Sequence, residues 1–417
     1  MRCPLVAPSL LLAALLPLNG CAPIDLDPIA VTPDPAPAPS PSSPRVLLPP
    51  PGSSPAAPSD LVRRPDRADL SGDGLPDFAV GAPLRSRVSV YVSSARPLTL
   101  DSPLSLFGAS LAYVGDLDGD GYSDLAVGAP GSDAVVLFSG APGGLDPEPR
   151  SVLHGEPGSG FGATLAAVGD LDGDGRDDLV VGSVAGHRVS LLRGQSGAMP
   201  SRVSAELEGP ADEGFATAIT SLGDGRVVVA LPGEGSLLVL TAREGAFQQR
   251  ARILVAETRI VDIGMAALDA NGDGRTDLAV TGGSLPGIVW IHGTADGFSS
   301  PVAGPGGSGA GTVLANATDL DGDGDDELLL ASGAGLWMLP GDRAGMSSPV
   351  PWSVQSSGST AALRVVRDPS PGGRVTVLRG IPGQDAVEVL RVDRDLRSVS
   401  QIEALRGDTG SAFGAAL

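Results

Sequence analysis

Oxygen-bearing side chains recur at a fixed spacing in five stretches of this 417-residue chain. Each stretch carries them at its positions 1, 3, 5 and 9, with a glycine at position 6 and an apolar run from position 10. Alternating carboxylates around a turn suit a hard cation such as Ca²⁺, which takes about 6–8 oxygens at roughly 2.3–2.6 Å. The glycine readily adopts the positive φ that folds a chain back over an ion. The candidate metal ligands are Asp69, Ser71, Asp73 and Asp77; Asp116, Asp118, Asp120 and Asp124; Asp170, Asp172, Asp174 and Asp178; Asp269, Asn271, Asp273 and Asp277; and Asp319, Asp321, Asp323 and Glu327.

The first half of each stretch resembles the loop of an EF-hand, but the second half differs. An EF-hand needs a bidentate glutamate at position 12 and a helix after it. Position 12 lies instead in an aliphatic run that is typical of a strand, and it is Val80, Val127, Val181, Val280 or Leu330. Because the fourth carboxylate comes at position 9, we predict a calcium loop between two strands. A solvated acidic turn without metal is the alternative, above all where Ser71 takes position 3.

The acidic stretches also mark an internal repeat. A gap of 99 residues between Asp170 and Asp269 holds a reduced unit, in which Phe215 stands nine residues before Asp224 and the loop has shrunk to Asp-Gly-Arg. A seventh unit begins at Asp368 and has no further loop carboxylates. The seven starts are spaced 45–54 residues apart, enough for four short strands each. Such units predict an all-β fold, a seven-bladed β-propeller.

The complete motif runs from Phe107 to Pro130, as FG followed by DLDGDGYSDLAVGAP. It resembles the FG-GAP repeat of integrin α-subunit propellers and of many bacterial secreted proteins, over about residues 65–417. The resemblance implies a seven-bladed propeller with structural Ca²⁺, up to five ions, in loops that join the first and second strands of particular blades. The units at Asp269 and Asp319 depart from the motif because they lack the FG phenylalanine.

The two ends of the repeat region have complementary defects. Phe413–Leu417 form an FG half-repeat with no loop behind it, whereas the unit at Asp69 has a loop with no FG segment before it. Together they make one complete unit. We therefore predict that the C-terminal segment closes the ring beside the first blade, since closure removes exposed sheet edges. A truncated eighth repeat is the alternative.

The residues before the repeats indicate export. Residues 1–20 are predicted to be a lipoprotein signal peptide, with an apolar stretch from Leu5 to Leu16. Leu18-Asn-Gly-Cys21 resembles a bacterial lipobox, so Cys21 is the predicted lipidation site; an ordinary secretory peptide is the alternative. Residues 21–60 are rich in Pro, Ala and Ser and are expected to be a disordered tether, and residues 61–417 are expected to be the propeller. This organisation predicts a lipoprotein of the cell envelope, at the outer membrane or cell surface.

The net charge and the absence of several sequence motifs argue against some classes of function. The net charge of −21 argues against nucleic-acid binding, although 21 of the 49 acidic residues lie in the five loops, and five Ca²⁺ would bring the charge to −11. GxSxG, HExxH, P-loop and Rossmann patterns are missing. The three histidines share no motif and are expected at turns or on blade surfaces: His154, His187 and His292. Four aromatic residues take similar places in their repeats and are expected to pack between blades: Tyr91, Phe138, Trp290 and Trp337.

These features together predict a monomeric interaction or adhesion module and not an enzyme. Its partner would be a protein or glycan bound on a propeller face, and its lipid anchor would hold it at a membrane. Two alternatives remain open at this point. One is a lectin-like glycan-binding propeller, and the other is an accessory or catalytic subunit that acts on polysaccharide or lipid.

Removal of calcium should destabilise the protein. EGTA is expected to lower the melting temperature by several degrees, because the ions bind the folded loops and scarcely the unfolded chain. Thermal unfolding followed by circular dichroism, with EGTA and with excess Ca²⁺, measures the difference. An unchanged melting curve in excess EGTA would contradict the prediction.

Overall fold

The computed structural model describes residues 68–92, 96–211, 214–243, 245–304, 312–333, 335–342, 345–346, 348–352, 358–367, 374–392 and 399–417. The predicted signal peptide, Cys21, the predicted tether and Asp368 lie outside these residues. Within the described part of the chain, no helix is both long enough and apolar enough to cross a membrane. The described residues form strands and four single-turn 3-10 helices.

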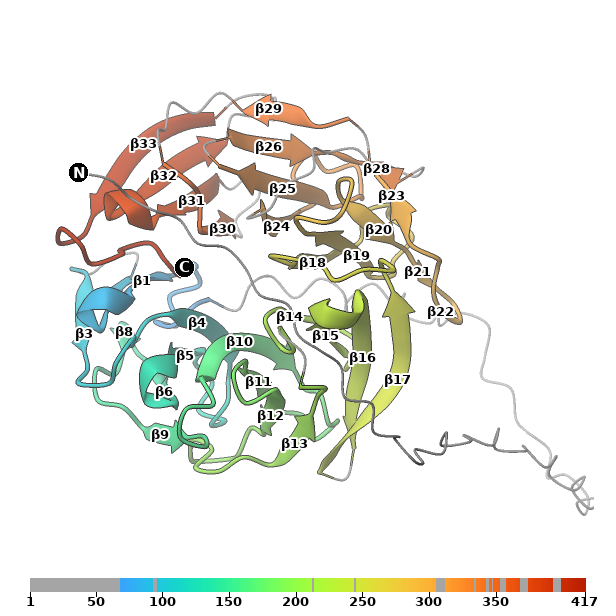
Figure 1. Ribbon diagram of the computed structural model, residues 1–417. Coiled ribbons are helices and arrows are strands. Elements are labelled where there is room, and N and C mark those ends of the chain that lie inside the picture. Colours follow the sequence, from blue (N-terminus) through green and yellow to red (C-terminus); the bar gives the residue numbers. More distant parts are fainter. Residues whose placement is uncertain are drawn as a thin grey trace, which may run out of the picture. The chain divides into compact units, whose positions relative to one another are not determined.

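Seven antiparallel sheets, named here blades 1 to 7 in chain order, succeed one another around a ring (Figure 1). Blade 1 contains β1 (Phe78–Ala82), β2 (Arg87–Tyr91) and β3 (Leu98–Asp101). Blade 2 contains β4 (Ser110–Gly115), β5 (Asp124–Ala129), β6 (Ala134–Phe138) and β9 (Ser151–His154), with a short hairpin of β7 (Gly140–Ala141) and β8 (Gly144–Leu145). Blade 3 contains β10 (Phe161–Gly169), β11 (Asp178–Ser183), β12 (Arg188–Leu192) and β13 (Ala205–Glu208).

The remaining blades repeat the same order of strands. Blade 4 contains β14 (Ile219–Ser221), β15 (Val227–Leu231), β16 (Ser236–Arg243) and β17 (Ala246–Leu254). Blade 5 contains β18 (Gly264–Leu268), β19 (Asp277–Thr281), β20 (Val289–Ile291) and β23 (Val302–Ala303), with a hairpin of β21 (Gly293–Thr294) and β22 (Gly297–Phe298). Blade 6 contains β24 (Thr312–Thr318), β25 (Glu327–Ser332), β26 (Gly335–Leu339) and β29 (Val350–Trp352), with a hairpin of β27 (Gly341–Asp342) and β28 (Gly345–Met346). Blade 7 contains β30 (Ala362–Arg367), β31 (Val375–Ile381), β32 (Ala386–Val392) and β33 (Val399–Arg406). The prediction of a seven-bladed, all-β propeller is confirmed.

The hydrophobic core is divided among the junctions between neighbouring blades. Seven separate clusters of buried residues join blade 1 to 2, 2 to 3 and so on, and the last joins blade 7 to blade 1. Every residue of β5 is buried, because this strand lies between a neighbouring blade on each side of its sheet. Strands covered on both faces read as continuous apolar runs, which explains the LAVGA-type segments of the repeats.

The second and third strands of four blades are joined by a 3-10 turn that begins at the proline of the GAP segment or at its equivalent. These turns are η2 (Pro83–Arg85), η3 (Pro130–Ser132), η4 (Pro232–Glu234) and η5 (Pro382–Gln384). Each ends at a residue in the left-handed conformation, namely Ser86, Asp133, Gly235 or Asp385. The acidic loops precede the second strand and these turns follow it, so the two lie at opposite ends of the blade. We call these ends the loop face and the turn face.

The C-terminal segment completes blade 1. The backbone N–H of Gly414 donates to the carbonyl oxygen of Gly81 at 2.9 Å, and the N–H of Gly81 donates to that of Ala416 at 3.0 Å. The equivalent of the bond from Gly414 to Gly81 is found within blade 2, where the N–H of Gly108 donates to the carbonyl oxygen of Gly128 at 3.0 Å. The C-terminus accordingly lies beside β1 in Figure 1. The prediction that the FG half-repeat closes the ring beside blade 1 is confirmed.

The FG glycine needs the left-handed conformation at this joint. Gly414 has φ 87°, and a Cβ there would stand 2.7 Å from the carbonyl oxygen of Ala386 in blade 7. Gly108 and Gly162 have φ 89° and 88° at the same place in blades 2 and 3. Blade 4 carries Ala216 there with φ 62°, a conformation that costs an alanine free energy. Blade packing therefore favours glycine at this place of the motif, because glycine adopts the left-handed conformation without the cost that Ala216 bears.

Truncation of Phe413 should destabilise the protein by weakening the contact that closes the ring. This side chain is 3% exposed and belongs to the cluster between blades 7 and 1. Phe413→Ala is expected to lower the free energy of unfolding by about 3–5 kcal/mol, the usual cost of removing a buried phenylalanine ring. Urea unfolding followed by circular dichroism measures the change. The control is Ile402→Ala on the exposed side of β33, which should cost less than about 0.5 kcal/mol; equal effects would contradict the prediction.

Candidate metal centre

Each acidic loop lies at the start of the second strand of its blade; in blade 1 this strand is β1, because the C-terminal segment takes the place of the first strand. The loops at Asp69, Asp116, Asp170, Asp269 and Asp319 precede β1, β5, β11, β19 and β25. The position-9 carboxylate opens or directly precedes the second strand, and strands rather than helices follow all five loops. The distinction from an EF-hand that the sequence predicted is thus confirmed.

In blade 2 the loop is folded around the carboxylate at position 1. Asp116 Oδ1 accepts hydrogen bonds from the backbone N–H groups of Gly119 at 2.7 Å and Asp120 at 2.9 Å, and its Oδ2 accepts one from Gly121 at 2.9 Å. Asp170 in blade 3 accepts the equivalent three bonds. These bonds wrap the chain into a tight turn and leave the carboxylates at positions 3 and 9 on the inner side of the loop.

The position-9 carboxylate ties the loop to the third strand. Asp124 Oδ2 accepts the N–H of Leu117 at 2.8 Å, and Asp124 Oδ1 accepts the N–H of Gly140 at 3.0 Å. Asp178, Asp277 and Glu327 accept equivalent bonds from Gly194, Gly293 and Gly341. All five position-9 residues are at most 1% exposed. A carboxylate in such a place must be compensated by a proton or by a cation.

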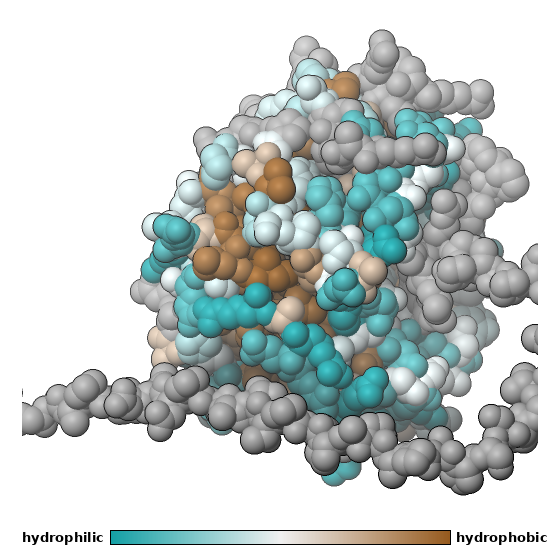
Figure 2. Space-filling model, turned by 90° about the vertical axis from the view of Figure 1, so that its right-hand side faces the viewer, coloured by the Kyte–Doolittle hydropathy of each residue, from teal (hydrophilic) through white to brown (hydrophobic). Residues whose placement is uncertain are grey.

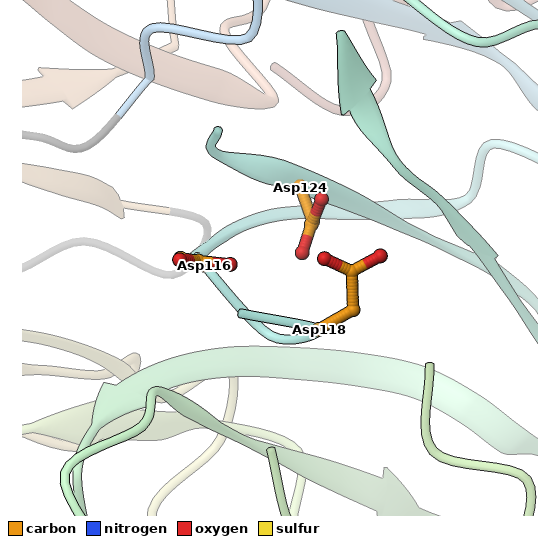
Figure 3. A group of neighbouring side chains, drawn as sticks. All are labelled: Asp116, Asp118 and Asp124. Atoms are coloured by element: carbon orange, nitrogen blue, oxygen red, sulfur yellow. The ribbon is translucent and has the colours of Figure 1, made fainter. Parts of the chain in front are cut away.

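The loops bring the carboxylates at positions 1, 3 and 9 together in blades 2, 3 and 6. In each of these blades, oxygens of the three residues lie within 4.8 Å of one another; the groups are Asp116, Asp118 and Asp124; Asp170, Asp172 and Asp178; and Asp319, Asp321 and Glu327. Figure 3 shows the carboxylates of the first group converging inside the blade 2 loop. Such an all-oxygen donor set with several negative charges fits Ca²⁺. A bound ion would supply the positive charge that the buried carboxylate lacks.

Burial shifts the protonation of these carboxylates in the protein without metal. Burial raises the pKa of Asp124 to about 8, against the opposing effect of the N–H groups of Gly140 and Leu117. Burial likewise raises the pKa of Asp178 to about 7 and of Glu327 to about 8. The neighbouring carboxylates at positions 3 and 5 raise the pKa of Asp124 further. The folded protein therefore holds protons at these sites near neutral pH, or exchanges them for a cation.

Blades 1 and 5 keep the loop but change its ligands. Position 3 is Ser71 in blade 1 and Asn271 in blade 5, so these loops offer a hydroxyl or an amide oxygen there. Ser71 Oγ lies 3.3 Å from Asp69 Oδ1, and Asp77 Oδ2 accepts the N–H of Leu70 at 2.9 Å, as in the other blades. The three-residue groups of blades 2, 3 and 6 do not include the position-5 carboxylates Asp120, Asp174 and Asp323. The position-5 carboxylates of blades 1 and 5 are Asp73 and Asp273.

Among its described residues, the reduced repeat in blade 4 has no ligand set of this kind. Its Asp224 forms an ion pair with Arg226, whose Nε lies 2.8 Å from Asp224 Oδ2. The seventh unit was expected to lack the site as well, and its Asp368 lies outside the described residues.

Sequence reasoning missed the residue that precedes the glycine at the end of the third strand. In blade 2 this residue is Ser139, whose Oγ lies 3.3 Å from Asp118 Oδ2 and 3.1 Å from Asp120 Oδ2. In blade 3 it is Arg193, which forms ion pairs with Asp172 and Asp174. In blade 5 it is His292, whose Nδ1 lies 3.2 Å from Asp277 Oδ2. His292 lies between β20 and β21 with its side chain 27% exposed, and the sequence did not indicate that it adjoins a candidate metal site.

Comparison with known proteins agrees with this geometry. A family model described as an FG-GAP-like repeat matches residues 116–181 and 269–330, which cover the loops of blades 2, 3, 5 and 6. The chain carries FG-GAP-like repeats. It is 36% identical over 155 residues to mouse integrin alpha-IIb and 38% identical over 156 residues to Xenopus laevis integrin alpha-5. Each match covers 30% of this chain and 15% of the relative, so the chain corresponds to a small part of these proteins.

Solved structures support the architecture alone. A functionally unknown protein from Desulfotomaculum acetoxidans aligns with a TM-score of 0.55 at 10% identity, over 80% of this chain and 99% of that one. A dihydro-heme d1 dehydrogenase aligns with a TM-score of 0.51 at 17% identity, over 85% of this chain and 68% of that one. At such low identity the likeness establishes the propeller and carries no argument about chemistry.

The FG-GAP-like loops also contact one another from blade to blade. Asp177, at position 8 of the blade 3 loop, accepts through Oδ2 the N–H of Asp116 in blade 2 at 3.2 Å. Asp326 in blade 6 does the same for Asp269 in blade 5, at 3.0 Å. Sequence reasoning did not assign position 8, because only some copies carry an acid there. These carboxylates couple adjacent loops instead of holding an ion.

The aromatic residues of the repeats pack as expected. Phe138 and Trp290 are buried in the clusters between blades 1 and 2 and between blades 5 and 6. Trp337 is partly buried against the latter cluster. Tyr91 stacks on Phe78 of its own blade, with ring centroids 4.7 Å apart, and is partly buried against the cluster between blades 7 and 1. These rings are engaged in packing, which removes the sequence feature that suggested stacking of sugars.

The metal-free protein should lose stability as the pH rises. The carboxyls of Asp124, Asp178 and Glu327 have pKa values raised to about 7–8 in the folded state, against about 4 in an unfolded chain. Between these values the folded state binds more protons than the unfolded state, so stability is full near pH 4 and declines up to about pH 8. Urea unfolding of protein passed over a chelating resin, from pH 5 to pH 8, measures this decline.

Saturating Ca²⁺ at pH 8 should restore the stability that the metal-free protein loses. The carboxylates with lowered pKa values, Asp133 and Asp385, destabilise the fold only at more acidic pH and do not obscure the trend. A metal-free protein whose stability is constant or increases from pH 5 to pH 8 would contradict the prediction.

Proposed function

We propose that this chain is an exported, lipid-anchored propeller that calcium stabilises and that binds a protein partner through its turn face. Calcium would occupy as many as five of the acidic loops, and the convergence of the carboxylates supports this part of the proposal. The lipobox-like segment that ends at Cys21 supports the anchor. The similarity to integrin alpha chains supports an interaction or adhesion role in preference to catalysis.

The placement of exposed hydrophobic residues on the turn face carries the proposal of a partner. Leu84, in η2, is 63% exposed, and Leu106 is exposed in the segment that leads to the FG motif of blade 2. That segment borders the turn of blade 2, because the N–H of Ser105 donates to Ser132 Oγ at 2.8 Å. Rigid propeller strands that present apolar side chains on end segments are suited to bind another protein.

Two further hydrophobic residues lie on the turn face at the junction of blades 4 and 5. Leu254 is 57% exposed at the end of β17, and the adjacent N–H of Val255 donates to the carbonyl oxygen of Gly235, which ends the turn η4. Val261 is exposed too, and its carbonyl oxygen accepts the N–H of Gly283 after β19. Four of the large exposed hydrophobic residues thus occur at the end of the blades opposite the acidic loops.

The outer side of the propeller is the other surface to consider. Figure 2 shows hydrophobic residues gathered on the side that faces right in Figure 1, with hydrophilic residues around them. Val302, in the outermost strand of blade 5, is exposed. It provides a matched control for the turn face, since it is apolar and exposed but belongs to an outer strand.

Substitution of the exposed leucines of the turn face by aspartate should strongly weaken partner binding. The full chain, immobilised in calcium buffer, is expected to retain a protein from its native envelope, and Leu84→Asp combined with Leu106→Asp should reduce that retention at least tenfold. Val302→Asp should leave it unchanged. Quantitative mass spectrometry of the retained proteins measures the effect.

Two outcomes would contradict the proposed function. Retention that Val302→Asp removes and the turn-face substitutions preserve would place the partner on the outer side. Retention of glycan without any protein would favour the lectin-like alternative.

A further inference from the structure

The loops of blades 2 and 3 have the same four ligand residues and differ in the residue beside them. Aspartate occupies positions 1, 3, 5 and 9 in both loops. In both, the glycine at the end of the third strand donates its N–H to the position-9 carboxylate, at 3.0 Å from Gly140 and 2.9 Å from Gly194. The residue before this glycine is therefore held at the same place next to each loop, and it is Ser139 in one and Arg193 in the other.

Ser139 and Arg193 contact equivalent carboxylates with opposite electrostatic consequences. The hydroxyl of Ser139 adjoins Asp118 and Asp120, adds no charge and can itself offer an oxygen. The guanidinium of Arg193 pairs through Nε with Asp172 Oδ2, and its second terminal nitrogen lies 3.7 Å from Asp174 Oδ2. These two carboxylates are the position-3 and position-5 candidate ligands of blade 3.

The Arg193 ion pair lies where a metal ion would take its ligands. The side chain of Asp172 is 3% exposed, so its oxygen faces the interior of the loop, whereas the arginine side chain is 37% exposed and approaches from the rim. A guanidinium keeps its positive charge at any physiological pH and presents several N–H donors to carboxylates. Calcium in this loop would have to displace the arginine from Asp172 and overcome the repulsion between the two cations.

We propose that Arg193 is an internal substitute for the calcium ion in blade 3, so that this loop stays free of calcium at concentrations that fill the loop of blade 2. This inference rests on the proposed binding of calcium by the other loops. From the ligand residues alone, the loops of blades 2 and 3 would be expected to bind calcium equally well, and Arg193 is what distinguishes them. One FG-GAP-like blade is thus stabilised by an ion pair of the chain itself, and its neighbour by a metal ion.

A reciprocal exchange of the two residues tests the proposal. Arg193→Ser gives blade 3 the residue of blade 2, and Ser139→Arg gives blade 2 the residue of blade 3. The full chain and both variants are stripped of metal, checked by circular dichroism and titrated with Ca²⁺ by isothermal calorimetry. Compared with the unchanged chain, Arg193→Ser should bind one more Ca²⁺ per chain and Ser139→Arg one fewer.

The outcomes separate the two proposals. If the unchanged chain binds calcium and Arg193→Ser binds it with the same stoichiometry and affinities, the proposed role of Arg193 is overturned. The proposed calcium binding by the other loops then still stands. No calcium binding by any of the three proteins would overturn both. Should Arg193→Ser fail to fold, Ser139→Arg decides: loss of one ion supports the substitution of metal by arginine, and unchanged binding refutes it.

Discussion

The buried carboxylate at position 9 is the group on which the structure of each blade with an acidic loop depends. In blade 2 this residue is Asp124, which is buried at the start of the second strand and joins the loop before that strand to the end of the third strand through two backbone hydrogen bonds. Its negative charge is costly in such a place, because burial favours the neutral form. The surrounding loop brings further carboxylates close to it, and this group of carboxylates can hold a proton or a cation. The rest of the acidic pattern follows from this one buried group.

Packing between blades imposes the second constraint, and it explains the glycines of the motif. A Cβ at Gly128 in blade 2 would overlap the carbonyl oxygen of Gly162 in blade 3, and Gly81 and Gly380 meet the next blade in the same way. The FG segment of one blade therefore lies against the GAP segment of the blade before it. Because every blade needs such a neighbour, the series is complete only as a ring, and the C-terminal FG segment supplies the last contact.

Much of the fold could be predicted from the sequence because its signals are local and repeated. The spacing from Phe107 to Asp116 recurs in three units, which made even the shortened loop at Asp224 recognisable. The candidate ligands were predictable for the same reason. Ser139, Arg193 and His292 were not, because two strands separate them from the loop and their type differs from blade to blade. Asp177 and Asp326 act between blades, a relation that no single repeat displays.

The candidate ligands and the exposed hydrophobic residues of the proposed partner surface lie at opposite ends of the blades. On the loop face, the ligand positions are restricted by the buried carboxylate and by the glycines that close the turn. On the turn face, Leu84 and Leu254 are exposed and belong to segments that hold none of the candidate ligands. The second strand connects the two ends of each blade. An ion at the loop face would thus influence a partner at the turn face only by fixing that strand, since the ion itself lies a full strand length away.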